Sequence, residues 1–127
     1  MKFQPDRADG VNLVTRQAAG RIWVGEQTWS CSLLVPWQGS VQDWGVTSLA
    51  DLRPPHFERI LTLRPELVVF GSGRRLRFVP PALYRALIEA RVGMETMDTA
   101  AACRTFNVLA GEGRSVVAAL LVEPSDL

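Results

Sequence analysis

The sequence predicts an α/β protein with a central mixed β-sheet and the order β-α-β-α-β in its carboxyl-terminal half. Two observations support this prediction. In the second half of the chain, short apolar segments alternate with helix-like segments, which is the pattern of strands joined by crossover helices. The first half is rich in tryptophan, glycine and short strand-like segments, and we expect its strands to pack as an extra β layer.

Four strand-like segments come before the first predicted helix. Residues 11–16 and 21–25 are joined by the sequence Gln-Ala-Ala-Gly, and this spacing predicts a hairpin. Residues 30–36 form an apolar segment that ends at Pro36. Residues 40–45 predict a short edge strand.

A helix between two strands sets the arrangement of the middle of the chain. Residues 54–63 predict a first, short helix that begins at a proline pair, where the missing N–H groups cost little. Residues 67–70 are an apolar run, typical of a strand covered on both faces. Residues 80–91 carry apolar side chains at helical spacing, and Gly93 is expected to end that helix. Because this crossover joins residues 67–70 to the strand at 94–97, we expect the two strands to be parallel neighbours or near neighbours.

A second full helix follows. Asp98 and Thr99 form an N-cap signal, and the helix is expected to run to about Ala110, where the sequence Gly-Glu-Gly stops it. Residues 115–122 predict a final, mostly buried strand, and the pattern alone leaves its direction open. We treat residues 1–127 as one domain.

Composition and charge exclude several classes of protein. The chain has 127 residues, 47% of them hydrophobic and 21% charged, as in an ordinary globular protein. A net charge of +1 argues against a nucleic-acid binder, which is usually strongly basic. No apolar run approaches the roughly 18 residues of a membrane helix, and the polar amino terminus lacks a signal-peptide pattern. We expect a soluble cytoplasmic protein that is a monomer or a weak homodimer.

The cysteines and the single histidine do not form a zinc-binding pattern. Cys31 and Cys103 form no Cys-x-x-Cys pair, and His56 is the only histidine, so no zinc pattern exists. We expect two reduced thiols, no metal and no cofactor.

Candidate binding residues gather where the two predicted parallel strands end, because ligands of open α/β sheets lie beyond the carboxyl ends of the strands. The loop after residue 70 does not match the dinucleotide fingerprint, since Leu76 occupies the third glycine position and the next helix is delayed until Pro80. It contains no Gly-Lys-Ser/Thr either. A nest of N–H groups with arginines beside it would hold a small anion; the alternative is a turn that needs positive φ. The candidate ligand-binding residues are Gly71, Ser72, Gly73, Arg74, Arg75, Asp98, Thr99, Cys103 and Asn107.

Three of these candidates form one flank of the last helix. Thr99, Cys103 and Asn107 are four residues apart, so their side chains line up. A thiol in the first turns of a helix can have a lowered pKa, and Cys103 is therefore a possible nucleophile, with a small core cysteine as the alternative. The only candidate base is His56, in another segment. Asn107 is unfavourable within a helix, so we expect it to bond a loop or a ligand, with residues 71–74 as the nearest loop.

The tryptophans raise a second possibility for function. Trp23, Trp29, Trp37 and Trp44 lie in a short span, where they form either a core under the β region or a surface for a protein partner. Val108 points away from the core stripe of its helix, so it is either exposed or covered by something else.

Residues 98–114, with the sequence DTAAACRTFNVLAGEGR, and residues 70–81, with the sequence FGSGRRLRFVPP, resemble a small family of unknown biochemical function. That family includes mitochondrial respiratory complex I (NADH dehydrogenase) assembly factor 3, an adipogenesis-associated Mth-type domain protein, and many bacterial and archaeal one-domain proteins. The residues that carry the resemblance are Gly71, Gly73, Asp98, Ala102, Cys103, Thr105, Phe106, Asn107, Leu109, Glu112, Gly113 and Arg114.

The resemblance implies a compact α/β domain with a central mixed sheet in which the last strand runs antiparallel. It brings no established enzymatic activity, and we found no complete catalytic motif, so we favour a non-enzymatic protein-binding or assembly module. The alternative is a small-molecule or anion-binding protein, with or without enzymatic activity, whose pocket lies at the carboxyl ends of the parallel strands.

Overall fold

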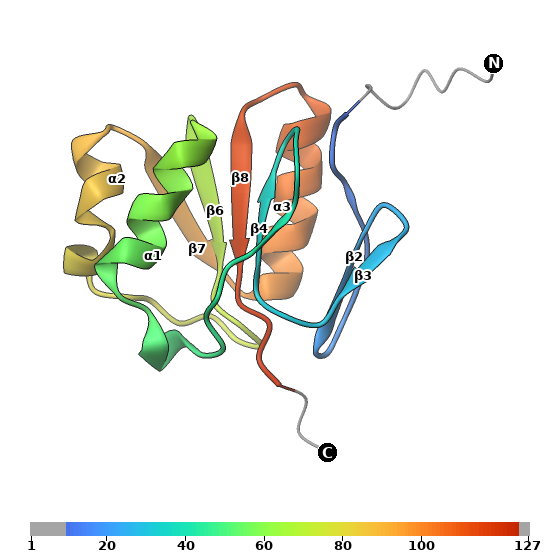
Figure 1. Ribbon diagram of the computed structural model, residues 1–127, viewed down its shortest axis with the longest axis horizontal. Helices are drawn as coiled ribbons and strands as arrows, with labels where there is room; N and C mark the ends of the chain where they lie inside the picture. The colour runs from blue at the N-terminus through green and yellow to red at the C-terminus, as the bar shows by residue number, and fades with distance from the viewer. Residues whose placement is uncertain (1–9, 125–127) are drawn as a thin grey trace.

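The computed structural model describes residues 10–124 and contains two β-sheets. The larger sheet has five strands in the order β5-β4-β8-β6-β7, and the smaller has three in the order β1-β2-β3. Helices α1 and α2 cover one face of the large sheet, and α3 covers the other (Figure 1). The predicted mixed α/β fold with an additional amino-terminal β layer is confirmed.

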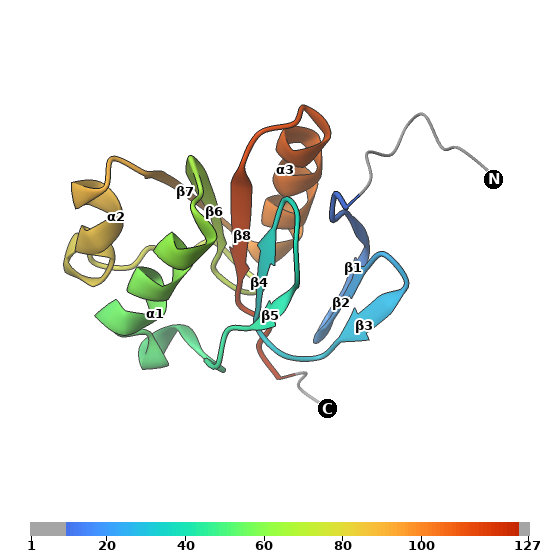
Figure 2. The same ribbon diagram turned by 45° about the horizontal axis from the view of Figure 1, so that its top comes forward.

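The small sheet is an antiparallel meander that packs against α3. It consists of β1 (Val14–Ala18), β2 (Arg21–Val24) and β3 (Gln27–Trp29). The hairpin between β1 and β2 was predicted. Strand β3 was not, because its short polar sequence has no apolar alternation, and only the left-handed turn at Gly25, with φ of 59°, directs the chain back along β2. In the turned view of Figure 2, this sheet stands apart from the large one.

The large sheet combines three parallel strands with an antiparallel pair. Its strands are β4 (Leu33–Pro36), β5 (Gln42–Asp43), β6 (Leu67–Gly71), β7 (Gly93–Met97) and β8 (Val116–Leu120). Strand β6 pairs in parallel with both β7 and β8, whereas β4 is antiparallel to β8 and to β5.

The last strand, β8, is thus antiparallel to one of its neighbouring strands and parallel to the other. The expectation that β8 runs antiparallel is correct against β4 and wrong against β6. The physical reason is that a full helix joins β7 to β8, and a crossover of this length returns the chain to start the next strand in the same direction.

The helices differ in regularity. They are α1 (Pro54–Glu58), α2 (Arg85–Glu89) and α3 (Thr99–Gly111), with 3-10 turns at Leu49–Asp51, Arg59–Leu63 and Pro81–Tyr84. The single helix predicted over residues 80–91 is instead a 3-10 turn followed by α2. It ends before Gly93, because Arg91 takes a left-handed conformation with φ of 61° and Gly93 already belongs to β7.

An apolar layer lies on each face of the large sheet, between the sheet and the elements that pack on it. Leu33 and Val69 face the side of α3 and pack with Phe106, whereas Leu34 and Phe70 face the side of α1 and α2. This alternation along β4 and β6 follows from the two-residue period of a strand. It fixes α3 and the small sheet on one side of the large sheet.

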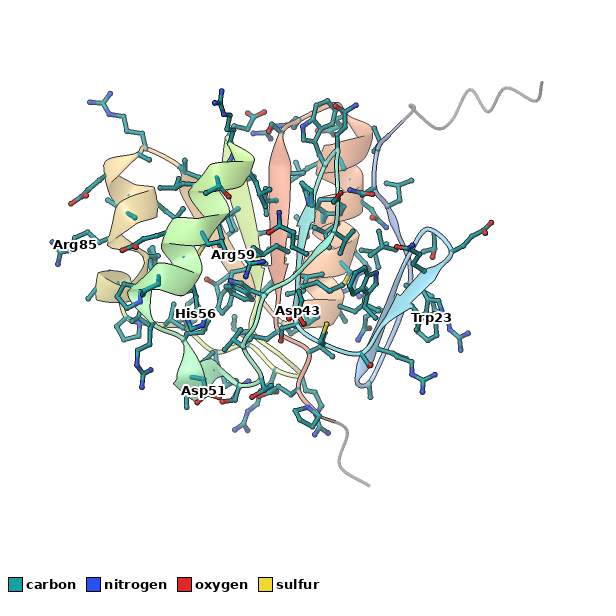
Figure 3. All side chains as sticks on the ribbon, in the orientation of Figure 1. Trp23, Asp43, Asp51, His56, Arg59 and Arg85 are labelled. Atoms are coloured by element: carbon teal, nitrogen blue, oxygen red, sulfur yellow. The ribbon has the colours of Figure 1, made fainter. Side chains whose placement is uncertain are left out.

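The tryptophans do not form one common core. Trp44 is fully buried against Phe57 and Phe70, and its Nε1 donates to the His56 carbonyl at 3.0 Å. Trp23 lies on the outer side of the small sheet (Figure 3), under the Arg16 guanidinium at 4.6 Å from the ring centre. The hypothesis of a tryptophan core is correct for Trp44. It is correct in part for Trp29 and Trp37, which are half-buried against the core on the α3 side.

Candidate functional site

Three loops leave the same edge of the large sheet, at the carboxyl ends of β6, β7 and β8. Gly71, the last residue of β6, pairs with Met97 of β7 on one side and with Leu120 of β8 on the other. The three exits are therefore level with one another. This is the sheet edge at which the sequence places the candidate residues.

Thr99 holds these three exits together. Its side-chain Oγ1 accepts a hydrogen bond from the Gly73 N–H at 2.9 Å and donates to the Leu121 carbonyl at 2.7 Å. Its own backbone N–H donates to the Gly73 carbonyl at 2.8 Å. Thr99 is buried, so its hydroxyl is a structural clamp between the loop after β6 and the end of β8.

Close contacts require glycine at position 71, and the backbone conformation favours glycine at position 73. A Cβ at Gly71 would lie 2.9 Å from both Cα and Oγ1 of Thr99. At Gly73, where φ is 104°, a Cβ would lie 2.5 Å from the Glu123 carboxylate and 2.6 Å from the Arg77 guanidinium. The loop is therefore shaped to fit its own neighbours, which is the role expected of glycine at such positions.

The N–H groups proposed for an anion nest are used within the protein. Ser72 N–H donates to the Met97 carbonyl at 2.8 Å, and Gly73 N–H donates to Thr99. Ser72 Oγ accepts from the Arg77 N–H at 2.9 Å and donates to the Arg75 carbonyl at 2.8 Å. These bonds favour the alternative interpretation of the loop, a turn that binds its neighbours.

Arg77 carries the loop's connection to the carboxyl-terminal segment. Its Nη2 lies 2.7 Å from Glu123 and also donates to the Ser72 carbonyl at 2.7 Å. An arginine that bridges a carboxylate and a carbonyl is held in one orientation. Arg77, one of the three arginines of the loop, therefore has a structural role.

A cavity of about 230 Å³ opens beside this clamp, between the β1–β2 hairpin turn and the first turn of α3. Four candidate residues line it: Gly73, Arg74, Asp98 and Thr99. The predicted N-cap role of Asp98 is confirmed, since its Oδ1 accepts from the Ala101 N–H at 2.8 Å. Ser72 is buried beside the cavity, and Arg75 is on the surface outside it.

Asn107 does not bond the loop after β6. Its amide donates to the Val14 carbonyl at 2.7 Å and accepts from the Val14 N–H at 2.8 Å. The expected loop partner is thus wrong, because eight residues of helix carry Asn107 about 12 Å from Thr99. Asn107 and Cys103 line a second hollow between β1 and α3. These two hydrogen bonds satisfy the Val14 backbone as a neighbouring strand would, and they attach the small sheet to α3.

Cys103 has the environment of a core residue. It is 3% exposed, and burial raises the pKa of its thiol to about 12. The candidate base, His56, lies on α1 across the large sheet, where its Nδ1 accepts from the Arg53 N–H at 2.9 Å. The hypothesis of a Cys103 nucleophile therefore has neither a lowered thiol pKa nor a base, and the core interpretation fits the structure.

Two apolar residues beside the site, Leu76 and Phe78, were not predicted to be functional from the sequence. Leu76 is 52% exposed and Phe78 is 71% exposed, the most exposed large apolar side chain in residues 10–124. The signal was present as the alternation of arginine with apolar residues over 75–78. Which set would face solvent could not be decided, because it depends on the Arg77–Glu123 ion pair, 46 residues apart.

Metal and membrane features are not found in the described residues. Within 10–124, no three His, Cys, Asp or Glu side chains gather in a way that could hold a metal ion. No helix in that range combines the length and apolar character needed to cross a membrane.

Comparison with known proteins relates most of the chain to one family. A family model described as "Protein of unknown function (DUF498/DUF598)" matches residues 14–121. NADH dehydrogenase [ubiquinone] 1 alpha subcomplex assembly factor 3 of Mus musculus is 33% identical over 98% of this chain and 67% of its own length. The protein of the same name from Bos taurus is 38% identical over 74% of this chain, which spans only 50% of that relative.

A solved structure shows the same fold. The solution structure of a Bordetella pertussis protein described as an Mth938-like domain superposes with a TM-score of 0.84. It is 32% identical and covers 100% of this chain and 96% of its own.

Proposed function

We propose that this chain, which belongs to the DUF498 family of proteins of unknown function, is a protein-binding module that helps to assemble a larger complex. The observation that carries the proposal is the exposed pair Leu76 and Phe78 beside the sheet-end loops. The relatives named as NADH dehydrogenase assembly factors support a role of this kind. Subunits of a respiratory NADH dehydrogenase are accordingly the first partners to test.

The pair has the properties of a binding hot spot. Burying an exposed aromatic or leucine side chain contributes roughly 1.5–3 kcal/mol each, and aromatic residues and arginines are enriched at the centres of interfaces. Arg77 and the buried Val79 anchor the segment on either side of Phe78. A partner would therefore meet a surface that is already ordered, which lowers the entropic cost of binding.

Affinity capture with cross-linking in the native host tests this function. We expect Phe78→Ser to remove a defined set of partners that the wild-type protein captures. Val108→Ser is the matched control, because Val108 is 61% exposed but lies on α3. Identical partner sets for the wild type and Phe78→Ser, in folded protein, would contradict the proposal.

A second candidate function rests on the cavity of about 230 Å³ beside Asp98. Its lining contains two carboxylates, Asp98 and Glu123, and one arginine, Arg74, among mostly apolar groups. Because Glu123 is paired with Arg77, the charges of the other two residues, Asp98 and Arg74, balance each other. The mostly apolar lining therefore favours a neutral or zwitterionic small molecule over an anion. A thermal-shift screen of metabolites is the test: Asp98→Asn, which keeps an N-cap side chain, should reduce stabilisation by a zwitterionic hit, and no hit across the screen would count against it.

A further inference from the structure

We infer that the protein partner presents an extended segment, acidic and apolar at alternate positions, which pairs along residues 75–79 in the manner of an added strand. The inference rests on the proposed protein-binding function and specifies the chemistry of the partner. Three independent features of segment 75–79 support it: the orientation of its side chains, the state of its backbone and its charge.

From Leu76 to Val79 the side chains alternate between solvent and protein. Arg77 is half-buried against Glu123 and Val79 is buried in the core, whereas Leu76 and Phe78 are exposed. A period of two residues is that of an extended chain. The two apolar side chains therefore stand on one side, spaced as they would be on a strand.

The backbone is paired along one edge only. The Arg75 carbonyl and the Arg77 N–H both bond to Ser72 Oγ, so these groups point toward the loop. In an extended chain the polar groups of the intervening residues point to the opposite edge. Within residues 10–124, the backbone groups of Leu76 and Phe78 have no hydrogen-bond partner. This edge can accept a strand, as in peptide recognition by β-addition.

The charge of the surrounding sequence favours an acidic partner. Residues 71–88 contain four arginines and no aspartate or glutamate. Arg77 is neutralised by Glu123, but Arg75 and Arg85 form no ion pair within the described residues. Arg85 projects from α2 away from the sheet (Figure 3). Carboxylates that alternate with apolar residues would meet the arginines while the apolar side chains cover Leu76 and Phe78.

Defined peptides test this inference on the full chain. The probe is a short soluble peptide with Glu at alternate positions and Leu or Val between them, compared with the same peptide carrying Lys for Glu. Binding is followed by the NMR amide signals of Leu76 and Phe78. We expect the acidic peptide to bind about tenfold or more tightly than the basic one, and Arg75→Glu to reverse the preference.

Backbone methylation of the probe distinguishes strand addition from a simple apolar contact. One version of the peptide is methylated at the backbone nitrogens of its Glu residues, and the other at those of its apolar residues. The N–H groups of only one of these two sets can point toward segment 75–79. We expect one version to lose binding while the other keeps it. Equal binding by both versions, or equal binding of acidic and basic peptides, overturns the inference.

The outcome can be separated from that of the proposed function. If no peptide binds but Phe78→Ser still removes the captured partner, the strand-addition inference fails and the protein-binding function stands. If Phe78→Ser changes neither peptide binding nor the set of captured partners, both the strand-addition inference and the protein-binding function fail. Binding to phosphatidylglycerol vesicles that requires Phe78, without peptide binding, also overturns the inference and identifies the segment as a membrane contact.

Discussion

The hydroxyl of Thr99 lies 2.9 Å from the backbone nitrogen of Gly73 and closes the loop after β6 onto the first residue of α3. The same oxygen reaches the Leu121 carbonyl at 2.7 Å. One buried side chain thus joins the exits of two parallel strands to the start of a helix. The loop for which the sequence offered a small-anion nest is held closed by the protein's own groups.

Replacing Thr99 by valine removes this clamp while keeping the shape of the side chain. The Gly73 N–H and the Leu121 carbonyl then lose their partner in a buried site, and each unsatisfied group costs about 1–3 kcal/mol. We expect the free energy of unfolding in urea to fall by about 2–4 kcal/mol. Thr28→Val is the control, since Thr28 is exposed on β3 and should change stability by less than about 0.5 kcal/mol. A loss for Thr99→Val as small as that of the control would contradict the clamp.

Two glycines with left-handed backbone, Gly73 and Gly113, can be separated by alanine substitution. Both have positive φ, of 104° and 80°, but only at Gly73 would an added methyl group meet other atoms within 4 Å. We expect Gly113→Ala to cost about 1 kcal/mol, the conformational cost alone. Gly73→Ala should cost about 3 kcal/mol or more, because the methyl group also displaces the Arg77–Glu123 pair. Equal losses in urea unfolding would show that the neighbours of Gly73 move aside freely.

The last helix shows what could be predicted from the sequence and what could not. Its N-cap at Asp98 and the strand before it follow from local patterns, and both were predicted. The partner of Asn107 is Val14, which is 93 residues away. No local pattern contains that contact, because it depends on how the small sheet docks on α3.

The same limit explains the errors in the site. Spacing placed Thr99 and Cys103 on one flank correctly, and both line hollows on that flank. Spacing does not report burial, which decides that the Cys103 thiol is held in the core. Spacing also does not show that Phe78 is exposed. That exposure follows from the ion pair with Glu123, which turns the neighbouring Arg77 side chain inward.

Asn107 can be tested as the link between the small sheet and α3. In Asn107→Ala the N–H and carbonyl of Val14 lose their partners, while the helix gains an alanine, which favours helical structure. We expect a net loss of about 1–2 kcal/mol and faster hydrogen exchange of the β1 and β2 amides than of those in β6. Val108→Ala, which is 61% exposed on α3 and lies outside the hollow between β1 and α3, should leave the exchange of β1 unchanged. Uniform acceleration across both sheets would contradict a local docking role.

Cys103 gives a prediction that depends on pH. Burial raises the pKa of its thiol from 9.0 to about 12 in the folded protein, whereas the unfolded thiol keeps an ordinary pKa. Below about pH 9 both states hold the proton, and this group adds no pH dependence. As the pH rises from about 9 toward 12, the unfolded state loses its proton first, so stability falls.

The measurement compares urea unfolding at pH 8 and pH 10, conditions that bracket the ionisation of the unfolded thiol, in a Cys31→Ala background. This background is needed because burial also raises the pKa of Cys31, which would add an effect of the same sign. We expect the loss of stability between the two conditions to be larger with Cys103 present than with Cys103→Ala. A thiol-reactive reagent should modify Cys103 only as fast as the protein opens. Rapid modification of the folded protein, with no difference in pH dependence, would restore Cys103 as a candidate reactive group.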